Sequence, residues 1–165
     1  MRILVSAASK HGATTEIAEA VGDELAERGH QIDVIPPEKV TSTDDRDAFV
    51  LGSAVYMGRW MPEARHLAER LGPTVGARPV WLFSSGPIGD PAMPTEDPVD
   101  AAAIIEATGA RDHRVFAGKL DKARLSVPER AVVRALKVQE GDFRDWDAIK
   151  VWAASIAESL RDAAE

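Results

Sequence analysis

Six residues between an apolar run and an amphipathic stretch are of types that could hold an anion. The apolar run is Ile3-Leu4-Val5, and the amphipathic stretch begins at Thr15. At such a strand-to-helix turn, small hydroxyl residues and a glycine let the backbone approach an anion, whose charge meets free N–H groups and the positive end of the helix dipole. The pattern predicts a site for a phosphorylated ligand, made by Ser9, Lys10, His11, Gly12, Ala13 and Thr14.

The spacing of these residues differs from the commonest phosphate-binding motifs. Neither G-x-x-x-x-G-K-[ST] nor G-x-G-x-x-G occurs in the chain, which disfavours a nucleoside triphosphate or a dinucleotide bound in the usual way. The alternative interpretation is that Ser9 or Thr14 only caps the helix that follows.

Length and composition predict one domain, residues 1–165. A chain of 165 residues with 45% hydrophobic content can bury a full core without dividing in two. Because cysteine is absent, disulfides, thiolate metal sites and cysteine nucleophiles are excluded. Three scattered histidines, His30, His66 and His113, lack the spacing of metal ligands, so no metal site is predicted.

Charge and hydropathy narrow the function classes further. The formal charge of −7 argues against a general nucleic-acid binder. No window approaches eighteen uninterrupted apolar residues, and the chain enters a strand directly instead of through a charged and then hydrophobic leader. We therefore expect a cytoplasmic protein with no transmembrane segment. The residues make no prediction about oligomeric state.

Short apolar runs alternate with helix-length segments along the whole chain. The strand-like runs are 3–5, 32–35, 49–51, 80–83 and 115–116. Helices are predicted from Thr15 to a stop at Gly29, over 61–71 with a stop at Gly72-Pro73, over 98–108 with a stop at Gly109, and over 146–160. This alternation predicts a doubly wound α/β fold, a parallel sheet with helices on both faces, and ligands at the carboxyl ends of its strands.

Two further segments at predicted strand ends are unlike ordinary turns. Residues 52–60 form a predicted loop with two aromatics and a methionine between glycines, and residues 84–90 are rich in hydroxyls and exposed backbone amides. Together with the anion site, they favour a flat heteroaromatic ring that carries a phosphate tail. Tyr56 is expected to stack on the ring and Trp60 to stack on it or to cap the following helix, whereas Trp81, Trp146 and Trp152 are expected in the core.

The first motif resembles the flavodoxin-like superfamily, in which [ST]-x-x-G-x-T follows the first strand. Ser9, Gly12 and Thr14 match this pattern. The resemblance implies five parallel strands in the order 2-1-3-4-5 and FMN as the cofactor. It implies that Gly58 offers its carbonyl to flavin N5, and it identifies no catalytic side chain. Besides residues 9–14, the implied cofactor contacts are Ala54, Val55, Tyr56, Met57, Gly58, Ser84, Ser85, Gly86, Pro87, Gly89 and Asp90.

Within this superfamily, the chain is most similar to the menaquinone-dependent protoporphyrinogen dehydrogenase branch. The similar motifs are S-K-H-G-A-T-x-E-I-A, Tyr-Met-Gly, A-G-K-L and Asp145-Trp146-Asp147, together with an inserted helical segment near 121–141. This resemblance implies an FMN-dependent oxidoreductase that takes electrons from a small-molecule reductant, protoporphyrinogen in that branch. It would pass them to a quinone, working peripherally at the inner membrane surface. The alternative is a soluble flavodoxin-type electron carrier that docks to redox proteins.

The inserted segment is strongly basic in a chain that is acidic overall. Residues 114–139 hold seven Lys or Arg against two Asp or Glu. On a predicted helix over 128–138, Arg130, Arg134 and Lys137 share one face. This face could meet porphyrin propionates, an acidic partner protein or anionic lipid headgroups. The alternative is an ordinary solvated surface.

Overall fold

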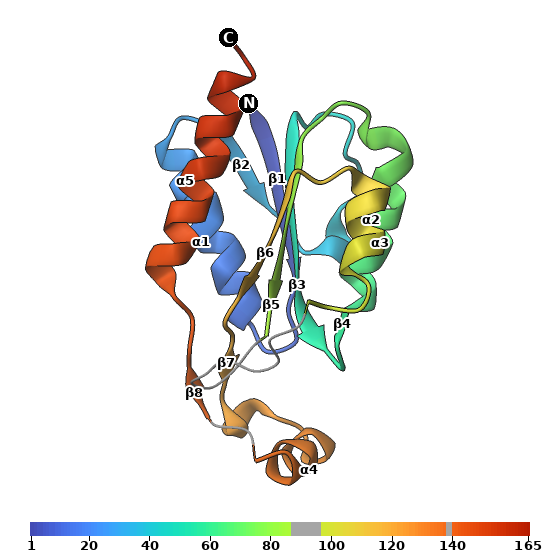
Figure 1. Cartoon of the computed structure of the whole chain (residues 1–165), viewed down its shortest axis with the longest axis vertical. Coiled ribbons are helices and arrows are strands. Elements are labelled where there is room, and N and C mark those ends of the chain that lie inside the picture. The colour runs from blue at the N-terminus through green and yellow to red at the C-terminus, as the bar shows by residue number, and fades with distance from the viewer. Residues whose placement is uncertain (87–96, 138–139) are drawn as a thin grey trace.

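Five parallel strands form the centre of the molecule in the order β2-β1-β3-β5-β6 (Figure 1). The computed structural model describes residues 1–86, 97–137 and 140–165. Counted along the chain, the parallel strands follow the predicted order 2-1-3-4-5, which confirms the doubly wound fold. Their bounds are β1 Arg2–Ala8, β2 Gln31–Val34, β3 Ala48–Tyr56, β5 Val80–Ser85 and β6 Asp112–Phe116.

Within the described residues, four helices cover the two faces of the sheet. Figure 1 shows α1 and α5 on one face and α2 and α3 on the other. Each presents apolar side chains to the sheet at helical spacing, which is what the sequence pattern required. A short 3₁₀ helix, η1 (Pro37–Lys39), connects β2 to β3. The bounds of the four are α1 Ala13–Glu27, α2 Pro62–Val75, α3 Ala101–Thr108 and α5 Trp146–Asp162.

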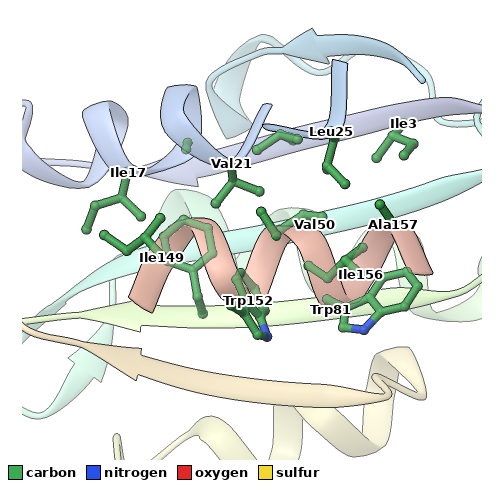
Figure 2. Close-up of a cluster of buried hydrophobic side chains, with 14 of the residues drawn as sticks. Ile3, Ile17, Val21, Leu25, Val50, Trp81, Ile149, Trp152, Ile156 and Ala157 are labelled. Carbon is green, nitrogen blue, oxygen red and sulfur yellow. The ribbon is translucent and has the colours of Figure 1, made fainter. Parts of the chain in front are cut away.

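Two apolar cores lie on opposite faces of the sheet. In the first, Val21 of α1 and Ile156 of α5 point toward each other over β1 and β3 (Figure 2). Trp152 closes this core, with its ring centroid 5.4 Å from that of Phe116 and 6.0 Å from that of Phe83. Trp81 belongs to this core, as predicted. The second core is made mainly by α2, β3 and β5 and includes Phe49, Leu51, Trp60, Leu67, Leu71 and Leu82.

The first core depends on one missing side chain in β3. Gly52 pairs with Phe83 across β3 and β5, and a Cβ atom at Gly52 would lie 2.3 Å from Phe83 Cζ. Both residues are in the sheet interior, and Phe83 is fully buried. The Phe83 ring therefore occupies the space that a side chain at position 52 would need.

Three predicted boundaries are wrong. The predicted stop at Gly72-Pro73 fails because α2 continues to Val75, which is buried in the second core, and Gly72 lets α2 approach the backbone of α3. The helix expected from Pro98 begins at Ala101. The predicted loop over 52–60 is mostly strand, because β3 extends to Tyr56 and pairs with the short antiparallel strand β4, Arg59–Trp60.

The inserted segment forms a small substructure beyond the carboxyl ends of the sheet (Figure 1). It leaves through β7 (Lys119–Leu120), passes through the 3₁₀ helix η2 (Lys122–Arg124) and α4 (Val127–Ala135), and returns through β8 (Gly141–Asp142). β7 and β8 pair with each other in antiparallel fashion. α4 therefore occupies most of the predicted helix, whose final residue lies outside the described residues.

Candidate functional site

A cavity of about 350 Å³ lies between the carboxyl ends of β1, β3 and β5 and the inserted segment. Its position agrees with the rule that doubly wound folds bind ligands at these strand ends. A second depression of about 490 Å³ is lined by Met1, by Arg28 and His30 after α1, and by the last turns of α5 with the residues that follow it. We assign the site to the first cavity because the predicted residues converge there: Ser9, Lys10, His11, Ala13, Thr14, Ala54, Val55, Tyr56, Met57, Ser85 and Gly86.

The phosphate loop, residues 9–14, is folded around the hydroxyl of Ser9. Ser9 Oγ accepts hydrogen bonds from the backbone N–H groups of Gly12 at 3.0 Å and Thr14 at 3.2 Å. Gly12 caps α1 with a left-handed φ of 89°, a conformation that side chains disfavour. The first N–H groups of α1 have no intrahelical partner, so the loop offers amides, hydroxyls and a helix dipole to an anion.

Lys10 and His11 extend from this loop to a buried carboxylate in α4. Glu129 is 7% exposed, accepts a hydrogen bond from His11 Nε2 at 3.0 Å and forms an ion pair with Lys10. The Lys10 ammonium holds the pKa of Glu129 below its ordinary value, and burial opposes this shift. The Lys10 ammonium also lies 4.4 Å from the Tyr56 ring centroid. The inserted segment and the phosphate loop are thus joined by a charged cluster, Lys10, His11 and Glu129.

Glu129 also organises the start of its own helix. Its side chain accepts a hydrogen bond from the backbone N–H of Ser126 at 3.3 Å, and the Ser126 hydroxyl accepts one from the backbone N–H of Glu129. This reciprocal pair is a capping box. One carboxylate therefore fixes both the first turn of α4 and the contact of α4 with the phosphate loop.

A two-residue turn presents the aromatic wall of the cavity. Met57 and Gly58 have φ angles of 53° and 74°, which fits the tight type I′ hairpin turn between β3 and β4. Tyr56 precedes the turn, lines the cavity and is 50% exposed. The Gly58 carbonyl accepts a hydrogen bond from the backbone N–H of Val99 at 2.8 Å. Gly58 does not line the cavity, and its contact with flavin N5 stays a prediction.

The remaining predicted contacts are placed differently. Gly12 shapes the phosphate loop without lining the cavity. Pro87, Gly89 and Asp90 lie outside the described residues. Ser84 is fully buried behind the cavity, where its hydroxyl accepts a hydrogen bond from Trp60 Nε1 at 2.8 Å and lies 2.7 Å from His113 Nε2. Because the indole N–H can only donate, Ser84 has its own proton to give to a neutral His113. Trp60 is therefore a core residue.

The Ser84–His113 hydrogen bond predicts a loss of stability in mild acid. Burial lowers the pKa of His113, so the unfolded chain takes up a proton near pH 6.5 before the folded protein does. The free energy of unfolding should fall as pH drops below 6.5 toward the folded-state pKa. In urea denaturation, we expect the free energy of unfolding of His113→Gln to fall less between pH 7.5 and pH 5.5 than that of wild type. His66→Gln, at an exposed position, is the control, and equal falls for His113→Gln and wild type would contradict the prediction.

Sequence reasoning missed the second wall of the cavity, which comes from the inserted segment. The apolar spacing on this segment was available in the sequence, on the side of α4 next to the basic stripe. Arg130, Arg134 and Lys137 are indeed exposed. The residues on the missed wall are Leu120, Leu125, Glu129, Val132, Val133 and Leu136.

The two ends of the cavity fit FMN. Two hydroxyl residues, Ser9 and Thr14, the Lys10 ammonium and the His11 imidazole line the cavity at the phosphate loop, where a phosphate could contact them. Ala54, Val55 and Tyr56 on one side and apolar residues of the inserted segment on the other form walls suited to a flat ring. Phosphate loop and ring walls are thus placed in one continuous cavity.

Comparisons with solved structures agree with this fold. Among solved structures, the chain is similar to a flavodoxin from the domain Archaea, with a TM-score of 0.66, 18% identity and coverage of 98% of this chain and 99% of that chain. A flavodoxin from Streptococcus pneumoniae TIGR4 is similar with a TM-score of 0.65 and 19% identity, and the match covers 99% of this chain and 99% of that chain. The rubredoxin oxygen:oxidoreductase of Desulfovibrio gigas gives 0.65 and 14%, covering 98% of this chain but 36% of that chain.

Sequence comparison assigns the family. No curated protein sequence matches the chain. The model of the flavodoxin domain family matches residues 4–147, which include the phosphate loop, both cavity walls and the inserted segment. This match, together with the structural likeness and the fit of the cavity, identifies FMN as the cofactor. The chain belongs to the flavodoxin domain family.

Proposed function

We propose that this protein is an FMN-dependent oxidoreductase that oxidises an apolar, anionic organic molecule, with protoporphyrinogen as the candidate substrate and a quinone as the acceptor. The observation that carries the proposal is the second wall of the cavity. A chain that only exchanges electrons with other proteins needs no apolar cover over its cofactor. Here Leu125, Val132 and Leu136 supply one.

The charges of the inserted segment favour an anionic substrate. Lys119 lines the cavity, and Arg124 is exposed close to it, on the same segment as the exposed side chain of Arg130. Carboxylates at the edge of an apolar molecule could pair with these cations while the apolar body contacts Val132 and Leu136. A tetrapyrrole with propionate groups has this combination of properties.

The protein's own residues would bind FMN and shield its ring. When bound, FMN accepts electrons from the donor and passes them on. The phosphate loop would hold the cofactor, Tyr56 would support the ring, and the apolar residues of α4 would cover part of it. In each turnover two electrons and two protons leave the donor, and the quinone takes up the same number to become a quinol.

The surface of α4 supports a cytoplasmic protein that works peripherally at a membrane, where a quinone is found. Val127 and Leu136 are 80% and 70% exposed beside the basic stripe, a combination typical of helices that lie at a lipid interface. No helix in the described part of the chain is both long and apolar enough to cross a membrane.

A second candidate is a soluble electron carrier for redox proteins. It is favoured by the similarity to single-domain flavodoxins, which extends over 98% or more of both chains. The net charge of −7 would let an acidic surface meet a basic partner. The inserted segment weighs against this candidate because its local charge has the opposite sign.

An anaerobic reduction experiment distinguishes the two functions. The FMN-loaded protein is mixed with protoporphyrinogen while the visible flavin band and porphyrin fluorescence are followed together. The oxidoreductase proposal expects protoporphyrinogen to bleach the flavin, with three FMN reduced for each porphyrin formed because that conversion removes six electrons and six protons, and reoxidation on addition of a menaquinone analogue. Leu136→Asp, which places a charge on the apolar wall, should slow the bleaching without removing FMN. If the flavin stays oxidised with this donor but accepts electrons from a flavodoxin reductase, the result would contradict the oxidoreductase proposal and support the electron-carrier function.

A further inference from the structure

The charged cluster places a carboxylate beside the groups that should hold the FMN phosphate. Glu129, Lys10 and His11 all line the cavity. Glu129 is buried and engages both the Lys10 ammonium and the His11 imidazole. In a site built for a dianion, a buried carboxylate of the same sign requires an explanation.

We propose that Glu129 and the phosphate of FMN compete for Lys10 and His11, so that Glu129 sets the affinity for FMN and FMN binding loosens α4. The inference rests on FMN binding at the phosphate loop. It does not depend on which substrate the protein oxidises. Glu129 thereby becomes a determinant of discrimination between phosphorylated and unphosphorylated flavin.

The competition follows from charge and valence. A phosphate dianion at the loop repels a carboxylate at short range, and the cavity's apolar walls weaken screening of that repulsion. Lys10 is a flexible point charge that can turn from one anion to another. His11 has one ring nitrogen bonded to Glu129, and the same nitrogen cannot donate its single hydrogen fully to both anions.

The consequence for α4 follows from how few contacts dock it. Val132 and Leu136 of this helix remain 49% and 70% exposed although they line the cavity. Glu129 is the buried polar anchor between α4 and the phosphate loop. Arg124 adds a hydrogen bond from Nη1 to the His11 carbonyl at 3.1 Å, from an exposed position on η2. When Lys10 and His11 turn to phosphate, α4 loses its charged anchor while its capping box stays in place.

The test compares FMN with riboflavin, which carries the same ring without a phosphate. Glu129→Gln keeps side-chain size and can still close the capping box, but removes the charge. We expect the dissociation constant for FMN to fall roughly five- to tenfold, as removal of a like charge near a dianion should produce. The value for riboflavin should change less than twofold. Glu140→Gln makes the same charge change at an exposed position of the segment and should leave both constants unchanged.

Hydrogen exchange of α4 supplies the second measurement. At equal saturation of the wild-type protein, amides of residues 127–135 should exchange faster with FMN than with riboflavin, and Glu129→Gln should abolish this difference. Weaker FMN binding by Glu129→Gln, equal changes for both flavins, or stronger protection of α4 by FMN than by riboflavin would each overturn the competition. Failure of both flavins to bind wild type would overturn the cofactor site itself.

Discussion

Gly12→Val is expected to lower the affinity for FMN about a hundredfold, or roughly 2.7 kcal/mol. Gly12 has a φ of 89°, and a β-branched residue is strongly disfavoured in this region of backbone space. Relief of that strain would turn the peptide away from Ser9 and displace the N–H groups of Gly12 and Thr14 from their present directions. Titration of the protein against FMN fluorescence measures the loss directly.

Gly29→Val is the matched control for this substitution. Gly29 has a φ of 91° and follows the other end of α1, with no atom within 4 Å of a Cβ built there. Both variants should therefore lose stability through backbone strain, but only Gly12→Val should lose FMN. Equal affinity in wild type and Gly12→Val would show that the loop does not hold the phosphate. Equal losses of FMN affinity in Gly12→Val and Gly29→Val would show that lower protein stability alone causes the effect.

Gly52→Ala should produce the largest loss of stability among single-methyl changes to the sheet, about 3 kcal/mol. The new Cβ would lie 2.3 Å from Phe83 Cζ, and the ring cannot move away because Phe116 and Trp152 surround it with centroids 6.2 and 6.0 Å distant. Either β3 and β5 separate or the aromatic cluster repacks. Urea denaturation of the apoprotein gives the change in unfolding free energy.

A smaller residue at position 83 should rescue this variant. Phe83→Leu alone costs stability by leaving a void, whereas in the Gly52→Ala background it makes room for the new methyl group. We expect the double variant to be at least 1 kcal/mol more stable than the sum of the single losses, a coupling typical of residues in contact. Additive losses would show that the methyl group does not meet the ring.

The sequence predicted the fold well because its signals are local. Strand runs such as Val80 to Phe83 and the spacing of Ile17, Val21 and Leu25 are visible in short windows, and the parallel sheet follows from their alternation. The phosphate loop was predictable for the same reason, since Ser9, Gly12 and Thr14 are adjacent in the chain.

The features that were missed depend on contacts between distant segments. Pro73 normally ends a helix, but burial of Val75 keeps α2 helical beyond it. Ser84 has the residue type of a ligand group, yet Trp60 and His113 engage its hydroxyl. Glu129 and Lys10 are 119 positions apart in the chain, and no local sequence pattern predicts such a contact.

The paired strands β7 and β8 have a consequence for how this protein can diversify. The inserted segment leaves and returns through neighbouring positions, with Lys119 opposite Asp142, and Arg144 secures the return by bonding to the carbonyl of Ala13 and to Glu16. Its two ends are thus fixed to each other and to the rim of the site. Everything between them can be shortened, lengthened or exchanged without disturbing the sheet. The choice of substrate can therefore change within this segment while the sheet stays the same, whereas a change at Glu129 would also alter the contact with the phosphate loop.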